Sequence, residues 1–220
     1  MSSSLIQLLV LAGVAVFLIL KLRSVLGTRE GFEKPPLPLD APSTARTKSG
    51  FEVIDGGPDR DIIDHAPEGS ASALALADMK RAEPSFSVGT FLQGARGAYE
   101  MILMGFERNE LAKIRPFLGE DVAKTFADAL ESRDADGLSV ESNFVGIRDL
   151  TLHEATFHSQ TRLAEIAVRF TGELTSVVRN KAGEVIEGKP DEIKRQRDVW
   201  TFARTMGSDD PNWLLVATGD

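Results

Sequence analysis

The stretch DVWTFARTMGSDDPNWLLVAT, residues 198–218, decides the fold that we expect for this chain. Residues 199–204 alternate along the chain with the period of two that is typical of a strand, and residues 213–216 form a second short apolar run. Residues 207–212 between them are rich in turn-forming types. Both tryptophans, Trp200 and Trp213, lie here, and large aromatic side chains bury the most area. We therefore predict an antiparallel hairpin that anchors the core.

Upstream of this hairpin, helical patterns come first and strand patterns follow. Phe91, Ala95, Ala98, Ile102 and Phe106 recur at helical spacing, and residues 120–133 predict a further helix. Residues 150–157 and 163–178 read as strands. This order predicts an α+β fold, with helices packed on one face of a curved antiparallel sheet of about four strands.

Three glycines interrupt the first long helix. Gly94, Gly97 and Gly105 each cost about 1 kcal/mol relative to alanine in a helix interior. We therefore expect each of them to let another backbone come close.

Residues 5–20 are apolar except for Gln7 and Gly13, and we predict a transmembrane anchor within residues 1–26. A cleaved signal peptide is the alternative, but a basic n-region and a small-residue cleavage site are missing. Lys21, Arg23 and Arg29 follow the run and no basic residue precedes it, which predicts that the rest of the chain is cytoplasmic. The apolar anchor residues are Leu5, Ile6, Leu8, Leu9, Val10, Val14, Val16, Phe17, Leu18, Ile19 and Leu20.

The N-terminal segment lacks the arginine-rich, amphipathic character of a mitochondrial presequence. We therefore expect the membrane to be a bacterial inner membrane. The matrix side of a mitochondrial inner membrane is the alternative. Residues 27–84 are rich in proline, small polar and acidic residues and read as a flexible linker, whose short apolar islands could instead dock on a partner. We expect the folded domain at residues 85–220.

The composition limits the chemistry. The net charge of −8 argues against a nucleic-acid binder, and the chain has no cysteine to ligate a metal or act as a nucleophile. His65, His153 and His158 lack the spacing of a metal site. Tyr99 reads as a core residue and Asp198 as a structural hydrogen-bond acceptor. We expect no metal, no cofactor and no catalytic residues.

A basic cluster stands just before the hairpin. Lys194, Arg195 and Arg197 are interpreted by default as a solvated loop. The sharper alternative is a contact with anionic lipid head groups, since each basic side chain near such a surface contributes about 1 kcal/mol.

Four segments of the chain resemble, in order, those of the Tim44-like domain family, named for the membrane anchor of the mitochondrial import motor. They are residues 91–100 (FLQGARGAYE), 167–170 (AVRF), 183–188 (GEVIEG), and the DVWTF and DPNW of the hairpin. Residues 26–30 (LGTRE) resemble the bacterial, TimA-type members. Asn109-Glu110 departs from the Gly-Asp expected after the first long helix, and both pairs suit a turn.

The resemblance implies a cone similar to the nuclear-transport-factor-like (NTF2-like) and cystatin-like folds, with a hydrophobic pocket and no catalysis. Mitochondrial members bind acidic lipid, a translocation channel and a chaperone, and a relative anchors the mitochondrial ribosome. The large side chains that we assign to the pocket are Phe91, Tyr99, Ile102, Phe106, Phe170, Trp200, Phe202 and Trp213.

These observations favour a membrane-anchored, non-catalytic adaptor that recruits a protein partner or a hydrophobic segment to the inner membrane, in a context of protein translocation or membrane biogenesis. A small-ligand-binding protein or enzyme with the same cone, and a structural anchor of a larger assembly such as the ribosome, are the alternatives.

Overall fold

The computed structural model describes residues 59–219. The expected anchor, residues 1–26, and the first part of the expected linker lie outside these residues. Among the helices that are described, none has both the length and the apolar character needed to cross a membrane.

Helices come first in the described part and strands follow, as the sequence predicts. The elements are α2 (Arg60–Ile63), α3 (Ala71–Ala82), α4 (Val88–Glu107), α5 (Leu111–Ile114), the 3-10 helix η1 (Arg115–Phe117), α6 (Glu120–Asp136), β1 (Ser139–His158), β2 (Leu163–Arg179), β3 (Val185–Gly188), β4 (Lys194–Thr205) and β5 (Leu214–Gly219).

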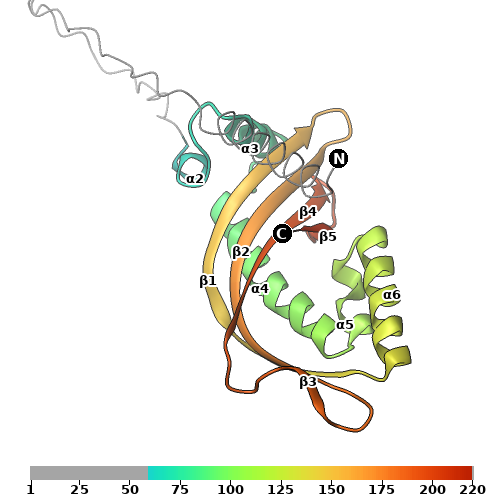
Figure 1. The fold of residues 1–220 in the computed structure, drawn as a ribbon. Helices are drawn as coiled ribbons and strands as arrows, with labels where there is room; N and C mark the ends of the chain where they lie inside the picture. Colours follow the sequence, from blue (N-terminus) through green and yellow to red (C-terminus); the bar gives the residue numbers. More distant parts are fainter. Residues whose placement is uncertain (1–58, 220) are drawn as a thin grey trace, which may run out of the picture. The chain divides into compact units, whose positions relative to one another are not determined.

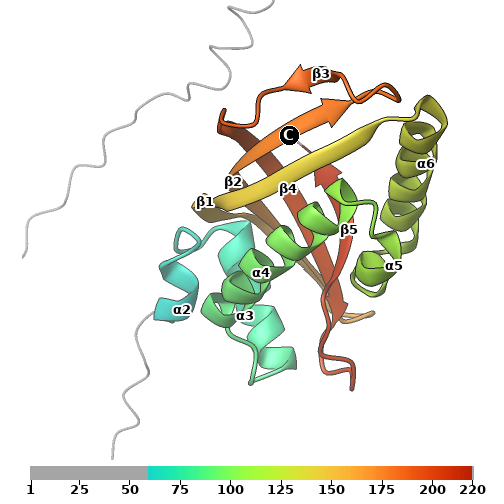
Figure 2. The same ribbon diagram turned by 90° about the horizontal axis from the view of Figure 1, so that it is seen from below.

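The strands form one antiparallel, unclosed sheet in the order β1-β2-β4-β5, with β3 paired to the far end of β2. The sheet thus has five strands, and the α+β class is confirmed. Figure 1 shows β1 and β2 curving around α4, and Figure 2 shows α3 and α4 on the same face of the sheet. We call this helix-covered face the concave face and the opposite one the convex face.

Strand alternation separates the two faces. In β2, Ile166, Val168 and Phe170 are fully buried under the helices, whereas Arg169 between them is exposed. Since β4 pairs with β2 in register, Trp200 and Phe202 join the same buried layer. The core is therefore the space between the concave face and α4.

The predicted hairpin is confirmed. β4 pairs with β5 in antiparallel register, with Trp200 opposite Thr218. In the turn, Asp210 Oδ1 accepts a hydrogen bond from the backbone N–H of Asn212 at 2.9 Å, as expected for an aspartate in a turn.

The folded unit begins earlier than the expected boundary at residue 85. Ile62 of α2 is buried, and Leu76 and Met79 of α3 are fully buried in the same core. Ser70 caps α3 by accepting a hydrogen bond from the N–H of Ala73 at 3.1 Å. Only one narrow face of α3 is buried, and it is formed by Ala73, Leu76 and Met79. The rest of the helix is rich in alanine, so the sequence pattern does not show that α3 packs in the core.

The first strand is also longer than expected, since β1 begins at Ser139 rather than near residue 150. Its pairing with β2 shifts between Phe144 and Gly146, between Ile147 and Asp149, and between Leu152 and Glu154. Such bulges interrupt the alternation of apolar and polar residues from which strands are predicted.

Candidate functional site

The start of α4 is fixed by an aspartate that the sequence places in the linker. Asp61 accepts hydrogen bonds from the N–H groups of Val88 and Gly89, at 2.8 and 2.9 Å, and lies 2.7 Å from Lys80 Nζ. Burial alone would raise the pKa of Asp61, but Lys80 and the two N–H groups outweigh it and lower the pKa to about 2. Asp61 thereby joins α2, α3 and α4.

The other end of α4 is fixed by close packing. A Cβ atom at Gly105 would collide with Cγ2 of Ile114, a fully buried residue of α5. This glycine is needed for the close approach that the sequence predicts, although a side chain rather than a backbone comes close. Gly94 and Gly97 are different, since a Cβ atom at either would meet nothing within 4 Å.

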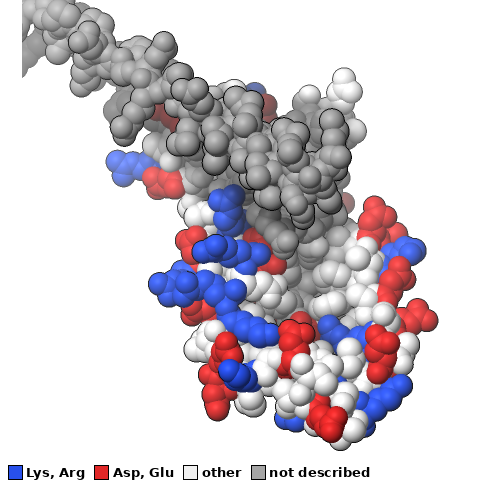
Figure 3. All heavy atoms as spheres, in the orientation of Figure 1, with Lys and Arg blue, Asp and Glu red and all other residues white. Residues whose placement is uncertain are grey.

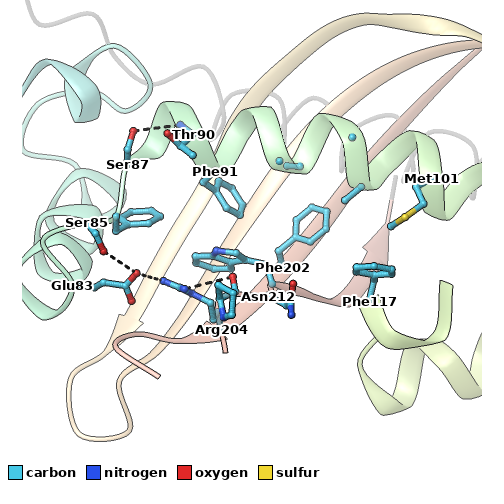
Figure 4. A pocket seen from close by; sticks show the side chains of 17 residues that line it. Glu83, Ser85, Ser87, Thr90, Phe91, Met101, Phe117, Phe202, Arg204 and Asn212 are labelled. Carbon is cyan, nitrogen blue, oxygen red and sulfur yellow. Dashed lines mark hydrogen bonds and ion pairs between the residues drawn. The ribbon is translucent and has the colours of Figure 1, made fainter. Parts of the chain in front are cut away.

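Between these two ends, an open groove of about 430 Å³ runs along α4, and we call it the α4 groove. Its walls come from α4, the turn before α4, η1, β4 and the hairpin turn (Figure 4). The lining residues are Glu83, Ser85, Phe86, Ser87, Thr90, Phe91, Gly94, Ala95, Gly97, Ala98, Met101, Phe117, Phe202, Arg204, Pro211, Asn212 and Trp213.

Aromatic rings form much of the groove. Phe91 of α4 packs against Trp213 with ring centroids 4.7 Å apart and meets the ring of Phe202 edge-on at 6.1 Å. Figure 4 shows Met101 and Phe117 together at the opposite end from Glu83 and Arg204. Because Gly94 and Gly97 have no side chain, the α4 wall of the groove exposes its backbone at these two positions.

An ion pair closes one end of the groove. Arg204 lies 2.6 Å from Glu83, and their side chains are only 9% and 18% exposed. Glu83 also accepts a hydrogen bond from the N–H of Gly207 at 2.7 Å. Burial would raise the pKa of Glu83, but the hydrogen bonds from Arg204 and Gly207 outweigh it and lower the pKa.

Arg204 has further contacts. Its guanidinium lies 5.3 Å from the ring centre of Trp213, a cation–π geometry. Its Nε is buried and has no hydrogen-bond partner among the residues that the structure describes. The closed end of the groove therefore combines an aromatic ring, an ion pair and one N–H group without an acceptor.

Of the side chains assigned to a pocket from the sequence, Phe91, Phe202 and Trp213 line the α4 groove. Tyr99, Ile102, Phe170 and Trp200 instead fill the core, where Tyr99 stacks on Phe170 at 4.4 Å. Phe106 packs against Phe126 at 4.6 Å, away from the groove.

Tyr99 and Asp198 have the structural roles that their sequence positions predict. Tyr99 is fully buried, and its hydroxyl donates a hydrogen bond to Asp198 Oδ2 at 2.5 Å. Burial, together with this carboxylate, raises the pKa of the phenol.

The basic cluster is divided between the two faces of the sheet. Arg195 and Arg197 lie opposite Glu173 and Thr171 on the convex face. Lys194 lies opposite the buried Leu174 and forms an ion pair with Glu187 at 3.1 Å. The three side chains thus do not share one surface.

No group of three or more metal-ligating side chains is found in residues 59–219. Ser87, in the groove, is hydrogen-bonded to Asp61 at 3.1 Å, and no histidine stands beside it to act as a base. The geometry is suited to holding an apolar group.

Comparison with known proteins identifies the family. The family model of the Tim44-like domain matches residues 72–220, which is most of the chain. The chain belongs to the Tim44-like family. The match begins inside α3, in agreement with the structure, where α3 is part of the folded unit.

Mammalian members of the Tim44-like family are similar to this chain in sequence. The human mitochondrial import inner membrane translocase subunit TIM44 is 27% identical over 144 residues, and the rat protein of that name is 26% identical. The aligned region covers 64% of this chain but only 31% of either relative. The relatives therefore share a Tim44-like domain with this chain and not their full length.

Among solved structures, the intermembrane-space region of the chloroplast protein ARC6 resembles this Tim44-like chain with a TM-score of 0.40 and 9% identity. It covers 58% of this chain and 94% of that region.

Proposed function

We propose that this chain is a non-catalytic adaptor that holds a protein partner, or an apolar segment of one, in the α4 groove at the cytoplasmic face of a membrane. The observation that carries the proposal is the groove itself, an apolar and aromatic channel of about 430 Å³ bordered by Gly94 and Gly97. A Cβ atom at either glycine would meet no atom of the described chain within 4 Å beyond the helix itself. Because glycine destabilises a helix interior, their presence is explained by a partner that comes close there.

Membrane attachment is the second part of the proposal. The apolar run at residues 5–20 would act as the anchor, and the basic residues Lys21, Arg23 and Arg29 favour a cytoplasmic folded domain. A bacterial inner membrane fits best, and the matrix side of a mitochondrial inner membrane is the alternative. The relatives are named as subunits of a translocase of the mitochondrial inner membrane, which supports a role in protein translocation or membrane biogenesis.

A small amphipathic ligand is the second candidate for the groove. Its volume lies within the range of about 300–1,000 Å³ that is common for ligand pockets. The Nε–H of Arg204 donates to no acceptor in the described chain. An oxygen atom of such a ligand could accept this hydrogen bond once the groove opens at that end.

Filling the groove tests the proposal. In Gly97→Leu a side chain projects into the groove, and because no atom lies within 4 Å of its Cβ position the fold should tolerate it. Gln93→Leu is the matched control, since Gln93 is exposed on the same helix but does not line the groove. If the new leucine in Gly97→Leu displaces one apolar group of the partner, the lost contact is worth about 1.5 kcal/mol or more. The affinity for the partner should then fall roughly tenfold or more.

Proteins that co-purify with the detergent-solubilised full chain should therefore be depleted by Gly97→Leu and retained by Gln93→Leu. Equal retention by both variants would show that the groove is not the binding site. If the bound component proves to be a small molecule detectable by mass spectrometry, the second candidate takes precedence.

A further inference from the structure

The hydrogen-bonding side chains of the α4 groove are unevenly distributed along it. Those with a charged, hydroxyl or amide group are Glu83, Ser85, Ser87, Thr90, Arg204 and Asn212. Figure 4 shows them on the side of the groove away from Met101 and Phe117, and the indole of Trp213 lies beside Arg204. The lining from Gly94 to Met101 is apolar, and the backbone of α4 there is bonded within its own helix. Most of the groove therefore offers no hydrogen-bonding partner to an occupant.

A polypeptide in this apolar part must satisfy its own backbone. In an extended segment, the N–H and C=O groups that face the apolar walls would lack partners, and each such group costs about as much as a lost hydrogen bond. In an α-helix the interior groups are bonded within the helix. The lack of hydrogen-bonding groups in the groove therefore favours a helix over a strand.

The exposed stripe of α4 has a shape that suits a second helix. Its small residues recur at helical spacing, and they are Thr90, Gly94, Gly97 and Ala98. The distance between two packed helices depends on the side chains at their contact, so small residues allow a close approach. The rings of Phe91 and Phe202 and the side chain of Met101 border this stripe with apolar surface.

The closed end of the groove favours one direction for such a helix. The side chain of Arg204 is only 9% exposed, and its Nε–H has no acceptor within residues 59–219. The last four C=O groups of a helix lack partners inside the helix, so its C-terminal end can supply the acceptor. The exposed Pro211, whose carbonyl oxygen is 3.5 Å from Nη1 of Arg204, would have to move aside. Since α4 begins at the same end, the two helix dipoles would be antiparallel, which is favourable.

The opposite end of the groove adjoins acidic surface. Phe117 lies in η1, which leads directly into α6, and Figure 3 shows Asp and Glu side chains predominating over α6. Glu120 is paired with Arg115 at 2.6 Å, whereas Asp121 forms no ion pair within residues 59–219. Because a helix carries partial positive charge at its N-terminus, this end favours the N-terminus of a partner helix.

We propose that the occupant of the α4 groove is an α-helix of a protein partner, antiparallel to α4, with an apolar face on Gly94 and Gly97 and its C-terminal end beside Arg204. This inference rests on the proposed function and specifies the kind of segment that the groove receives. Thr90 and Met101 lie about 16 Å apart along α4. The partner helix therefore has about three turns in contact with the groove.

Crosslinks from two positions test the helix and its direction. A photo-crosslinking residue replaces Thr90 or Met101 in the full chain in cells, and the attached partner peptides are sequenced by mass spectrometry. A partner helix spans the distance between these positions with about 11 residues, whereas an extended segment spans it with about 5. We expect the two attachment points in the partner to be about 11 residues apart. The point reached from Thr90 should lie on the C-terminal side of the other.

A synthetic peptide of the captured segment tests the helix independently. Its affinity for the detergent-solubilised full chain is measured by fluorescence anisotropy. A proline at the centre of the peptide should lower the affinity about a hundredfold, because proline breaks a helix interior. A proline at the first helical residue is the control and should have little effect. Equal tolerance of both prolines would mean that the segment does not bind as a helix.

Replacing Arg204 by lysine tests the contact at the closed end. Arg204→Lys keeps the positive charge beside Glu83 but removes the Nε–H group, so the affinity for the peptide should fall about two- to tenfold. Arg81→Lys, at an exposed position of α3, is the matched control and should bind as the natural chain does. Tryptophan emission checks that each variant is folded. Unchanged affinity in Arg204→Lys would overturn the contact, and if this variant does not fold, the order of the two crosslinks still decides the direction.

The possible results separate this inference from the proposed function. If Gly97→Leu removes the protein adducts but their attachment points lie about 5 residues apart or in the reverse order, the inference is overturned and the adaptor function stands. If neither position yields a protein adduct, or if Gly97→Leu leaves the adducts unchanged, both are overturned. If mass spectrometry finds a small molecule in the groove instead, the inference is wrong and the second candidate function takes precedence.

Discussion

Arg204 of β4 donates a hydrogen bond from Nη2 to Glu83 Oε1 at 2.6 Å, and the pair joins the hairpin to the residue that ends α3. Removing one partner of such a shielded ion pair leaves an unpaired charge and costs about 3 kcal/mol or more. We predict that Arg204→Met lowers the free energy of unfolding by about that amount. In the double variant Glu83→Gln/Arg204→Met the loss should be smaller than the sum of the two single losses. Urea titrations followed by tryptophan fluorescence measure both, and strict additivity would contradict the coupling.

Acid should weaken the start of α4. The pKa of Asp61 is lowered to about 2 from an ordinary 3.8, so its ionised form stabilises the fold above pH 3.8 and this contribution is lost as pH falls toward 2. A shift of this size corresponds to about 2 kcal/mol. Asp61→Asn should therefore be less stable than the natural chain at neutral pH, and the difference should vanish near pH 2. A difference that does not change between these pH values would mean that the carboxylate does not hold α4.

Alkali provides a separate test through the single tyrosine of the chain. Burial and the Asp198 carboxylate raise the pKa of Tyr99 above its ordinary value of 10.0. The contribution of the neutral phenol to stability is complete below pH 10 and is lost as the pH rises toward the folded-state pKa. Tyrosinate absorbance should therefore be absent from the folded chain at pH 11 and appear when the chain is unfolded in urea. If Tyr99 ionised near pH 10 in the folded chain, this result would contradict its burial and its hydrogen bond to Asp198.

Two glycines of α4 should respond to alanine in opposite ways. Gly105→Ala places a Cβ atom against the buried Ile114, and overpacking of this kind costs about 2 kcal/mol. Gly97→Ala meets no atom within 4 Å and should stabilise the chain by about 0.5–1 kcal/mol through its higher helix propensity. Thermal unfolding of the two variants measures this contrast. The same sign for both would show that α4 and α5 are not packed as described.

The sequence predicts the hairpin and α4 because their apolar residues recur regularly, with a period of two in the first strand of the hairpin and at helical spacing in α4. It does not predict the length of β1, where bulges at residues such as Gly146 break the alternation. It also misses the membership of α3 in the core, because the few large apolar residues of α3 stand among alanines, and Leu74 is exposed although Leu76 and Met79 are buried. Such a pattern is not distinguishable from a weak helix in a linker.

The candidate site is only partly predictable. An apolar helix face does not show which of its residues meet the sheet, so Tyr99 and Ile102 look equivalent to Phe91 although only Phe91 reaches the groove. Phe117 and Arg204 join the groove from other elements, through tertiary packing that no local pattern encodes. The sequence feature that does point to the groove is the pair of helix glycines, because Gly94 and Gly97 both lie in its α4 wall.

The central claim is that a partner occupies the α4 groove, and a photo-crosslinker in living cells tests it most directly. The crosslinking residue is placed at Met101, which is exposed in the groove, or at Lys124 of α6, which is exposed outside it. We predict a discrete adduct from Met101 that is absent from Lys124, lost in the Gly97→Leu background and kept in the Gln93→Leu background. The same adducts from both positions, or a Met101 adduct that Gly97→Leu leaves unchanged, would contradict the claim.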